Sequence, residues 1–363
     1  MLQARTRGFT FMIKVPRGAE GRLDLLGISP PIIQAPMAGS QGSALAIAVS
    51  NAGGLGSLPC AMIGPDQIRA ELKAITAATS KPYNVNFFVH KQPAPDPARE
   101  DAWLKLLAPS LAQHGIDPSS IQPGPQRAPF DDAAADVLEE FKPPVVSFHF
   151  GLPAAALVRR VKSWGSQILS SATTLDEARF LEAHGVDAII AQGYEAGGHR
   201  GMFLTDDLST QVGTFALVQQ IVRVVKVPVI AAGGIADAKG VEAAMALGAS
   251  AAQVGTAYLF CPEATTNPLH RAALKSDAAQ TTVVTNLFTG RPARGIVNRL
   301  IRELGPMNAG APAFPLAATA ILALRAKAEP KGVNDFTSMW AGQNAAAGRE
   351  VPAAELTRQL AGA

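Results

Sequence analysis

Short apolar runs alternate with amphipathic stretches along the chain from about residue 32 onward. The apolar runs are of strand length and rich in β-branched residues, and most are separated by a helical pattern. Parallel strands need long crossovers and bury both of their faces, so this alternation predicts a parallel sheet covered by helices. The expected strands are 32–37, 53–58, 83–88, 145–150, 167–172, 187–192, 227–232 and 251–256.

The stretches between the strands carry signals for the starts and ends of helices. The segment `PDQIRAELKAITAAT` begins with Pro65, which suits the first turn of a helix. Thr174 is a candidate N-cap, and Gly185 ends the same helix. Asp237 and Gly248 repeat this arrangement. Strands that alternate with helices in this way predict an α/β fold, a (β/α)8 TIM barrel, with an open doubly wound sheet as the alternative.

Three regions lie outside a minimal barrel. Residues 1–22 form a basic leader that we expect to be disordered, with a transit peptide as the alternative. The barrel is expected over 23–260, interrupted by a proline-rich insertion at 91–144 that follows the third strand and could act as a lid. Residues 261–363 should form a smaller α/β subdomain over the site, followed by a C-terminal helix.

Composition narrows the possible partners. The 363 residues carry a net charge of only +3, and no basic stripe is interleaved with aromatics, so neither nucleic acid nor a membrane is expected as a partner. No apolar run reaches the ~18 residues of a membrane span. Two distant cysteines indicate a reducing compartment, and a cytoplasmic location is expected. Without an HExxH motif or a Cys/His cluster, we expect no metal site. The sequence leaves the oligomeric state open, with a homodimer as one option.

Glycines at the ends of the last two strands point to a phosphate site. Gly233 and Gly234 end one strand, and Gly255 and Thr256 end the next. In TIM barrels these two loops commonly bind phosphate through backbone N–H groups and a helix N-terminus. Each pair alone could simply form a tight turn. Both together favour a phosphate ligand.

Other strand ends bring amides and apolar residues to the same rim. Pro36 and Met37 would form an apolar ledge after the first strand, although methionine also commonly fills a core. Asn86 lies in the third strand and Gln192 ends the sixth, and a buried amide needs a hydrogen-bonding partner. Two amides beside a phosphate site suit a heterocycle with donors and acceptors, such as a flavin.

The stretch `AQGYEAGGHRG` places a histidine on a glycine-rich loop after the sixth strand. A histidine on a loop is more often solvated than catalytic. Here Gly197 and Gly198 would let the backbone press against a flat ligand. A neutral His199 at this rim could take a proton from a substrate.

The sequence leaves the roles of the neighbouring polar residues open. His149 ends the fourth strand and is either a core histidine or a second site histidine. Glu195 and Arg200 are either site residues or ordinary surface charges. Cys60 has no evident base that would make it a nucleophile.

The chain resembles the nitronate monooxygenase family, once called 2-nitropropane dioxygenases. The resemblance runs from about residue 30 to 305. Flavin-dependent enoyl reductases also carry `EAGGH` and `AAGGI`, whereas `GRPARGIVNR` is more specific for the nitronate-oxidising branch. The matching stretches are `QAPMAG`, `AVSNAGGLGSL`, `YNVNFF`, `SFHFG`, `AQGYEAGGHRG`, `PVIAAGGIADAKG`, `AQVGTAYLF` and `FTGRPARGIVNRLIRE`.

The resemblance implies an FMN-binding barrel with a smaller subdomain over the site. It implies that FMN and dioxygen convert alkyl nitronates such as propionate 3-nitronate, or nitroalkanes, into a carbonyl compound and nitrite. His199 matches the family's catalytic base. An FMN-dependent NAD(P)H oxidoreductase acting on enoyl thioesters or quinones is the alternative, and a non-catalytic flavin binder is a second one. The residues that match FMN contacts are Asn86, Gln192, Gly197, Gly234, Gln253, Val254, Gly255 and Thr256.

Overall fold

The computed structural model describes residues 27–122 and 127–362. Eight parallel strands form one sheet in the order β1-β9-β8-β6-β5-β4-β3-β2. A bridge between Ile33 and Leu55 joins the two edge strands and closes the sheet into a barrel. The predicted (β/α)8 fold is confirmed. The strands are β1 (Ile32–Gln34), β2 (Gly56–Pro59), β3 (Tyr83–Phe88), β4 (Val145–His149), β5 (Gln167–Ala172), β6 (Ala188–Gln192), β8 (Val229–Ala232) and β9 (Ala251–Val254).

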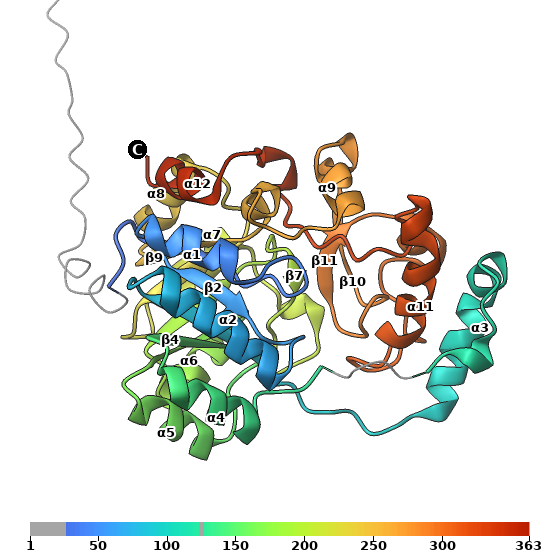
Figure 1. Ribbon diagram of the computed structural model, residues 1–363, viewed down its shortest axis with the longest axis horizontal. Helices are drawn as coiled ribbons and strands as arrows, with labels where there is room; N and C mark the ends of the chain where they lie inside the picture. Colours follow the sequence, from blue (N-terminus) through green and yellow to red (C-terminus); the bar gives the residue numbers. More distant parts are fainter. Residues whose placement is uncertain (1–26, 123–126, 363) are drawn as a thin grey trace, which may run out of the picture.

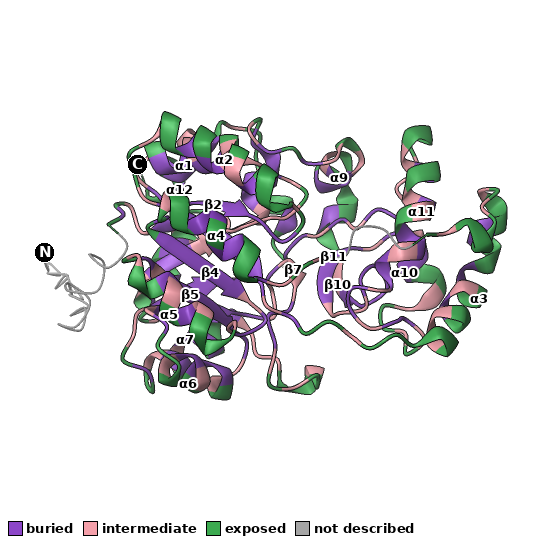
Figure 2. Cartoon of the chain, turned by 60° about the horizontal axis from the view of Figure 1, so that its bottom comes forward, coloured by how far each residue is buried: buried purple, intermediate pink, exposed green. Residues whose placement is uncertain are grey.

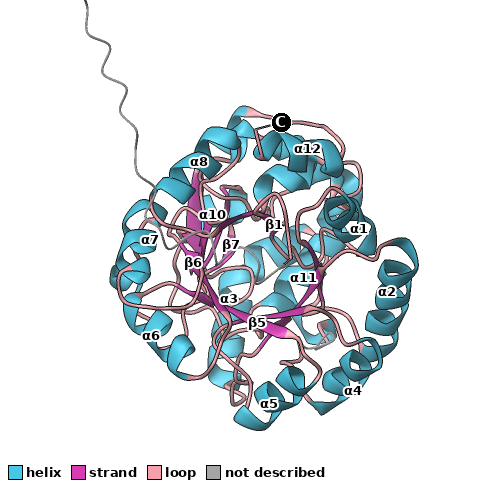
Figure 3. Cartoon of the chain, turned by 90° about the vertical axis from the view of Figure 1, so that its left-hand side faces the viewer, coloured by secondary structure: helices cyan, strands magenta, loops and turns pink. Residues whose placement is uncertain are grey.

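Helices surround the strands as an outer ring, which Figure 3 shows from one end of the barrel. Figure 2 shows that the strands are buried while the outer faces of the helices are exposed. Thr174 and Asp237 cap their helices through side-chain hydrogen bonds, as the sequence predicts. The helices of the ring are α1 (Ser43–Asn51), α2 (Pro65–Ala78), α4 (Asp132–Phe141), α5 (Ala155–Ser163), α6 (Leu175–Ala183), α7 (Thr214–Val222) and α8 (Ala238–Ala246).

A second unit lies at the C-terminal end of the barrel strands (Figure 1). Its three-stranded sheet has the order β10-β11-β7, so a strand that follows β6 pairs with strands from the C-terminal third of the chain. The strands are β10 (Thr282–Thr285), β11 (Ala293–Ile296) and β7 (Gly198–His199), and the helices of this region are α9 (Pro268–Leu274), α10 (Arg299–Leu304) and α11 (Ala318–Ala328).

Residues 91–144 divide between the two units. Helix α3 (Pro97–Gln113) packs Trp103 and Leu107 into an apolar cluster with Leu287, Phe288 and other residues of the second unit. Helix α4 instead covers the barrel between α2 and α5. We therefore propose that α3 belongs to the second unit and that the segment ends with an ordinary barrel helix.

The last helix, α12 (Ala353–Leu360), returns to the barrel. Leu356 and Leu360 pack with Leu45 and Val49 of α1 in one apolar cluster, and the two helices lie side by side in Figure 1. The leader expected over 1–22 lies outside the described residues. Among the helices of 27–122 and 127–362, none has both the length and the apolarity to cross a membrane.

Candidate functional site

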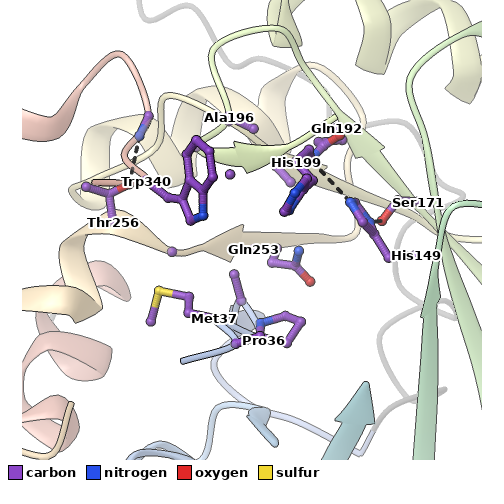
Figure 4. Close-up of a pocket in the computed structure, with 18 of the residues that line it drawn as sticks. Pro36, Met37, His149, Ser171, Gln192, Ala196, His199, Gln253, Thr256 and Trp340 are labelled. Atoms are coloured by element: carbon purple, nitrogen blue, oxygen red, sulfur yellow. Dashed lines mark hydrogen bonds between the residues drawn. The ribbon is translucent and has the colours of Figure 1, made fainter. Parts of the chain in front are cut away.

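A pocket opens where the barrel strands end and the second unit covers them (Figure 4). Most of the residues predicted from the sequence line it: Pro36, Met37, Asn86, Gln192, Gly197, Gly198, His199, Gly233, Gly234, Gln253, Gly255 and Thr256. Val254 does not. Its side chain is buried on the outer side of β9, in the apolar cluster beneath α1 and α12, because successive strand residues point to opposite faces.

His199 lies in a strand rather than on a free loop. As part of β7 it pairs antiparallel with Ala293 of β11. Its carbonyl oxygen accepts hydrogen bonds from Gln192 Nε2 at 2.9 Å and from His149 Nε2 at 3.1 Å. Its own Nε2 lies 2.9 Å from Thr289 Oγ1. Both the barrel and the second unit therefore fix this histidine.

Aromatic rings and positive charge surround the His199 imidazole. The ring centroid lies 5.3 Å from that of Phe314 and 5.5 Å from that of Trp340. Burial lowers the pKa of His199 well below its ordinary value, and the nearby charge of Arg127 lowers it further. The imidazole is therefore neutral at neutral pH, as a proton acceptor must be.

His149 lines the same pocket and holds its neighbour. Its Nδ1 lies 3.0 Å from Ser171 Oγ, and its Nε2 contacts the His199 carbonyl. Since a carbonyl only accepts, Nε2 carries the proton. Burial lowers the pKa of His149 to about 4, so the ring is neutral and Nδ1 accepts from the serine hydroxyl. His149 thus positions the backbone of His199.

The loops after β8 and β9 fit a phosphate. Gly234 has a φ of +74°, a left-handed conformation that glycine adopts without strain. Among the described residues, no acceptor faces the backbone N–H groups of Gly234, Ile235 or Gly255. Helix α8 begins just beyond, and the partial positive charge of its N-terminus favours an anion.

The rim between these loops and His199 offers polar atoms to a heterocycle. The side-chain oxygen of Gln253 is buried without a donor among the described residues, and the side chain projects between Pro36 and His199 in Figure 4. Asn86 donates to Ser147 Oγ at 2.9 Å and also lines the pocket. An unpaired buried oxygen of this kind can accept from a ligand N–H. The donors and acceptors therefore fit a flavin ring.

Two residues that the sequence predicts as ligand contacts also contact other parts of the protein. Gln192 donates to the carbonyl of His199, and its oxygen accepts from the Gly201 N–H at 2.7 Å. Position 197 requires glycine because the backbone of Gly342 passes close to it. A Cβ on residue 197 would lie 2.5 Å from the backbone nitrogen of Gly342. Both residues shape the His199 strand.

Glu195 and Arg200, left open by the sequence, have structural partners. The Glu195 carboxylate accepts from the Thr214 backbone N–H at 2.7 Å and so caps the start of α7. Arg200 is fully buried and donates to the carbonyl oxygens of Gly193 and Gln192. Cys60 is buried, and burial raises the pKa of its thiol, which argues against a nucleophile.

Several pocket residues were not found from the sequence. Trp340, His270 and Arg127 line it, and Thr289 contacts His199. They come from residues 261–363 and from the segment before α4. The described lining contains no Asp or Glu, so the pocket favours an anion. Within the part of the chain that the structure describes, no three His, Cys, Asp or Glu side chains gather as a metal site.

Comparisons with known proteins agree with this geometry. Residues 20–362 match the family model described as nitronate monooxygenase. The chain is 45% identical to a nitronate monooxygenase of Pseudomonas aeruginosa, over 93% of this chain and 96% of that one. It is 46% identical to a nitronate monooxygenase of Paraburkholderia phytofirmans, over 94% of each chain.

Among solved structures, a nitroalkane oxidase from Streptomyces ansochromogenes superposes with a TM-score of 0.85 at 39% identity, over 94% of this chain and 96% of that one. FabK from Thermotoga maritima matches less well, with a TM-score of 0.69 at 30% identity and 93% coverage of both chains.

Proposed function

Because this chain belongs to the nitronate monooxygenase family, we propose that the pocket holds FMN and that His199 is the base of the reaction. The enzyme is an oxidoreductase that acts on nitronates or nitroalkanes. We propose that dioxygen is the oxidant and that the products are a carbonyl compound and nitrite. The observation that carries the proposal is a neutral His199 ring in a pocket without acidic side chains.

The pocket residues divide into two groups for FMN. The N–H groups of Gly234, Ile235 and Gly255, together with the N-terminus of α8, would hold the phosphate. Gln253, Asn86 and the ledge of Pro36 and Met37 would hold the ring. FMN bound there would supply the redox chemistry, electron transfer between the electron-rich nitronate and dioxygen.

His199 would accept the proton that the substrate carbon loses. A neutral nitroalkane must lose a proton from carbon before it becomes an electron-rich nitronate. The imidazole takes this proton at a ring nitrogen, and the resulting imidazolium stays beside the anion that it has formed. With a preformed nitronate this proton transfer is not needed.

The charge of the pocket favours the substrate anion. The Arg127 guanidinium lies 5.6 Å from the centre of the Phe314 ring, and no ion pair of Arg127 occurs among the described residues. Coulomb attraction is strong in a partly desolvated site. Arg127 therefore helps to attract a nitronate.

The runner-up is an NAD(P)H-dependent reductase of the FabK type. The superposition on FabK is poorer than that on the nitroalkane oxidase, 0.69 against 0.85 in TM-score. The motif `FTGRPARGIVNR` supplies β11, which pairs with the His199 strand. These two observations favour nitronate oxidation. A cytoplasmic location stays a prediction, and a homodimer stays an open option.

The experiment is to purify the protein, release its cofactor by heat and identify it by chromatography. FMN is expected, because we propose a single phosphate site and the sequence has no dinucleotide loop GxGxxG after a strand. The same preparation should consume oxygen and release nitrite with propionate 3-nitronate. FAD, or a yellow protein that does not turn over any nitronate, would overturn the proposal.

A further inference from the structure

Thr289 lies where the second unit meets the catalytic histidine. It follows β10 in the turn that leads to β11, and its side chain is buried with 3% exposure. Its Oγ1 lies 2.9 Å from Nε2 of His199, within ordinary hydrogen-bonding distance. This is the one side-chain hydrogen bond of the His199 ring among the described residues.

One hairpin contacts both the backbone and the imidazole ring of His199. Strand β11 pairs with the backbone of His199 at Ala293, and the turn before β11 presents Thr289 to the ring. The carbonyl of Pro292, in the same turn, accepts from the Arg200 N–H at 2.8 Å. The same hairpin therefore pairs with the backbone of His199 and supplies the hydrogen-bond partner of its ring.

The available protons and acceptors decide the direction of the hydrogen bond. The Thr289 hydroxyl has one proton and, besides His199, one recorded acceptor, the carbonyl of Arg291 at 3.4 Å. Nδ1 of His199 has no partner among the described residues and is not shut off from the pocket. Nδ1 is therefore the nitrogen free to meet the substrate, and it can accept a proton only if Nε2 carries the other one.

We propose that Thr289 is a positioning residue that sets the tautomer of His199. Its hydroxyl accepts from Nε2–H and donates to the Arg291 carbonyl, which leaves the Nδ1 lone pair for the substrate. When a nitroalkane reacts, the carbon–hydrogen bond breaks, an Nδ1–H bond forms, and the electron pair stays on the substrate as the nitronate. The kinetic part of this inference rests on the proposed role of His199 as base.

The simpler role of Thr289 would be to complete its own turn. The hydroxyl donates a long hydrogen bond to Arg291 O, at 3.4 Å, whereas its contact with His199 Nε2, at 2.9 Å, is the shorter of the two. The shorter contact makes the histidine its main partner. The arrangement parallels a Ser-His-Asp triad, in which a third group fixes the tautomer of the base, but here that group is uncharged.

The test compares Thr289→Val, which keeps the size but removes the hydroxyl, with Thr289→Ser, which keeps the hydroxyl. In the FMN-loaded enzyme, nitrogen NMR of labelled histidine reports which ring nitrogen is protonated, and His199→Asn assigns the signal. The wild type and Thr289→Ser should show the Nε2–H form. Thr289→Val should show a mixture of tautomers and lose about tenfold in kcat/KM for a neutral nitroalkane, with little loss for a preformed nitronate.

Thr337→Val is the matched control. Thr337 is also buried in the second unit and donates to Glu329 at 2.8 Å, away from the pocket. It should leave the His199 signal and the substrate ratio unchanged. An Nδ1–H form in the wild type, or an unchanged signal in Thr289→Val, would overturn the proposal. If His199→Asn spares nitroalkane turnover, the base assignment fails instead, and the NMR result still decides the role of Thr289.

Discussion

His149 donates from Nε2 to the backbone carbonyl of His199, at 3.1 Å. Since Gln192 donates to the same oxygen, two side chains at the ends of β4 and β6 hold the backbone of the proposed base. This contact requires a neutral His149 whose Nδ1 accepts from Ser171. It links the protonation of a half-buried barrel histidine to the position of the proposed base.

Replacing His149 should make the enzyme less sensitive to acid. The pKa of His149 is about 4 in the folded protein, below its ordinary 6.5, so the unfolded chain binds more protons between these values. The free energy of unfolding then falls as pH drops from 6.5 towards 4, by at most about 1.4 kcal/mol per pH unit for one histidine. Denaturant unfolding between pH 7 and 4.5 should show a shallower decline for His149→Gln.

Three other histidines keep part of that slope. Burial also lowers the pKa values of His90 and His270 to about 4, and that of His199 well below its ordinary value. The variant should therefore stay acid-sensitive, but less so than the wild type. An identical slope in both proteins would mean that His149 is not held neutral by the fold.

His199→Asn should separate the two substrate types. The asparagine keeps a hydrogen-bond donor but has no basicity, so a neutral nitroalkane should lose about 10²–10⁴-fold in kcat/KM. A preformed nitronate should keep much of its activity, and the flavin spectrum should survive. Equal losses for both substrates at full FMN occupancy would make His199 a binding residue.

Gly234→Asp should abolish FMN binding. The side chain would stand in a left-handed backbone position and bring a negative charge to the proposed phosphate site. Gly332→Asp is the matched control, because Gly332 has a φ of +75° and open space around it, away from the pocket. Flavin content after purification should be near zero for the first variant and normal for the second. Normal content in both would place the phosphate elsewhere.

Arg127→Met should selectively weaken the binding of substrates that carry a carboxylate. If the guanidinium meets a carboxylate on the substrate, KM for propionate 3-nitronate should rise by about 10- to 100-fold, as expected for a charge-assisted hydrogen bond. KM for a nitronate whose alkyl chain carries no carboxylate should rise less. Arg223→Met removes the same charge from the exposed C-terminal end of α7 and should change neither value. An equal rise in KM for both nitronates would mean that Arg127 interacts with the nitronate group and not with the carboxylate.

Local patterns predicted the barrel well because strand periodicity and helix caps are local properties. The strands at 83–88 and 167–172 have the predicted bounds, and the others differ at their ends by a few residues. The glycines predicted after β8 and β9 line the pocket, and their contact with a phosphate stays a prediction. The motif `FTGRPARGIVNR` contains Thr289, so a signal for this residue was present, although its contact with His199 was not evident.

Long-range packing could not be predicted from such patterns. Nothing in the α3 sequence reveals that Trp103 packs in one apolar cluster with Phe288. Gln192 and Gly197 line the pocket, as predicted, but the sequence did not show that Gln192 also donates to the carbonyl of His199 or that Gly197 admits the backbone of Gly342. Trp340 and Arg127 reach the pocket only because the second unit folds over the barrel.

The most direct test of the account is anaerobic mixing of the FMN-loaded enzyme with propionate 3-nitronate or with NADH, followed by the flavin absorbance. We predict rapid bleaching by the nitronate, no comparable bleaching by NADH, and nitrite release once oxygen is admitted. Rapid bleaching by NADH with no response to the nitronate would contradict the central claim and favour a reductase.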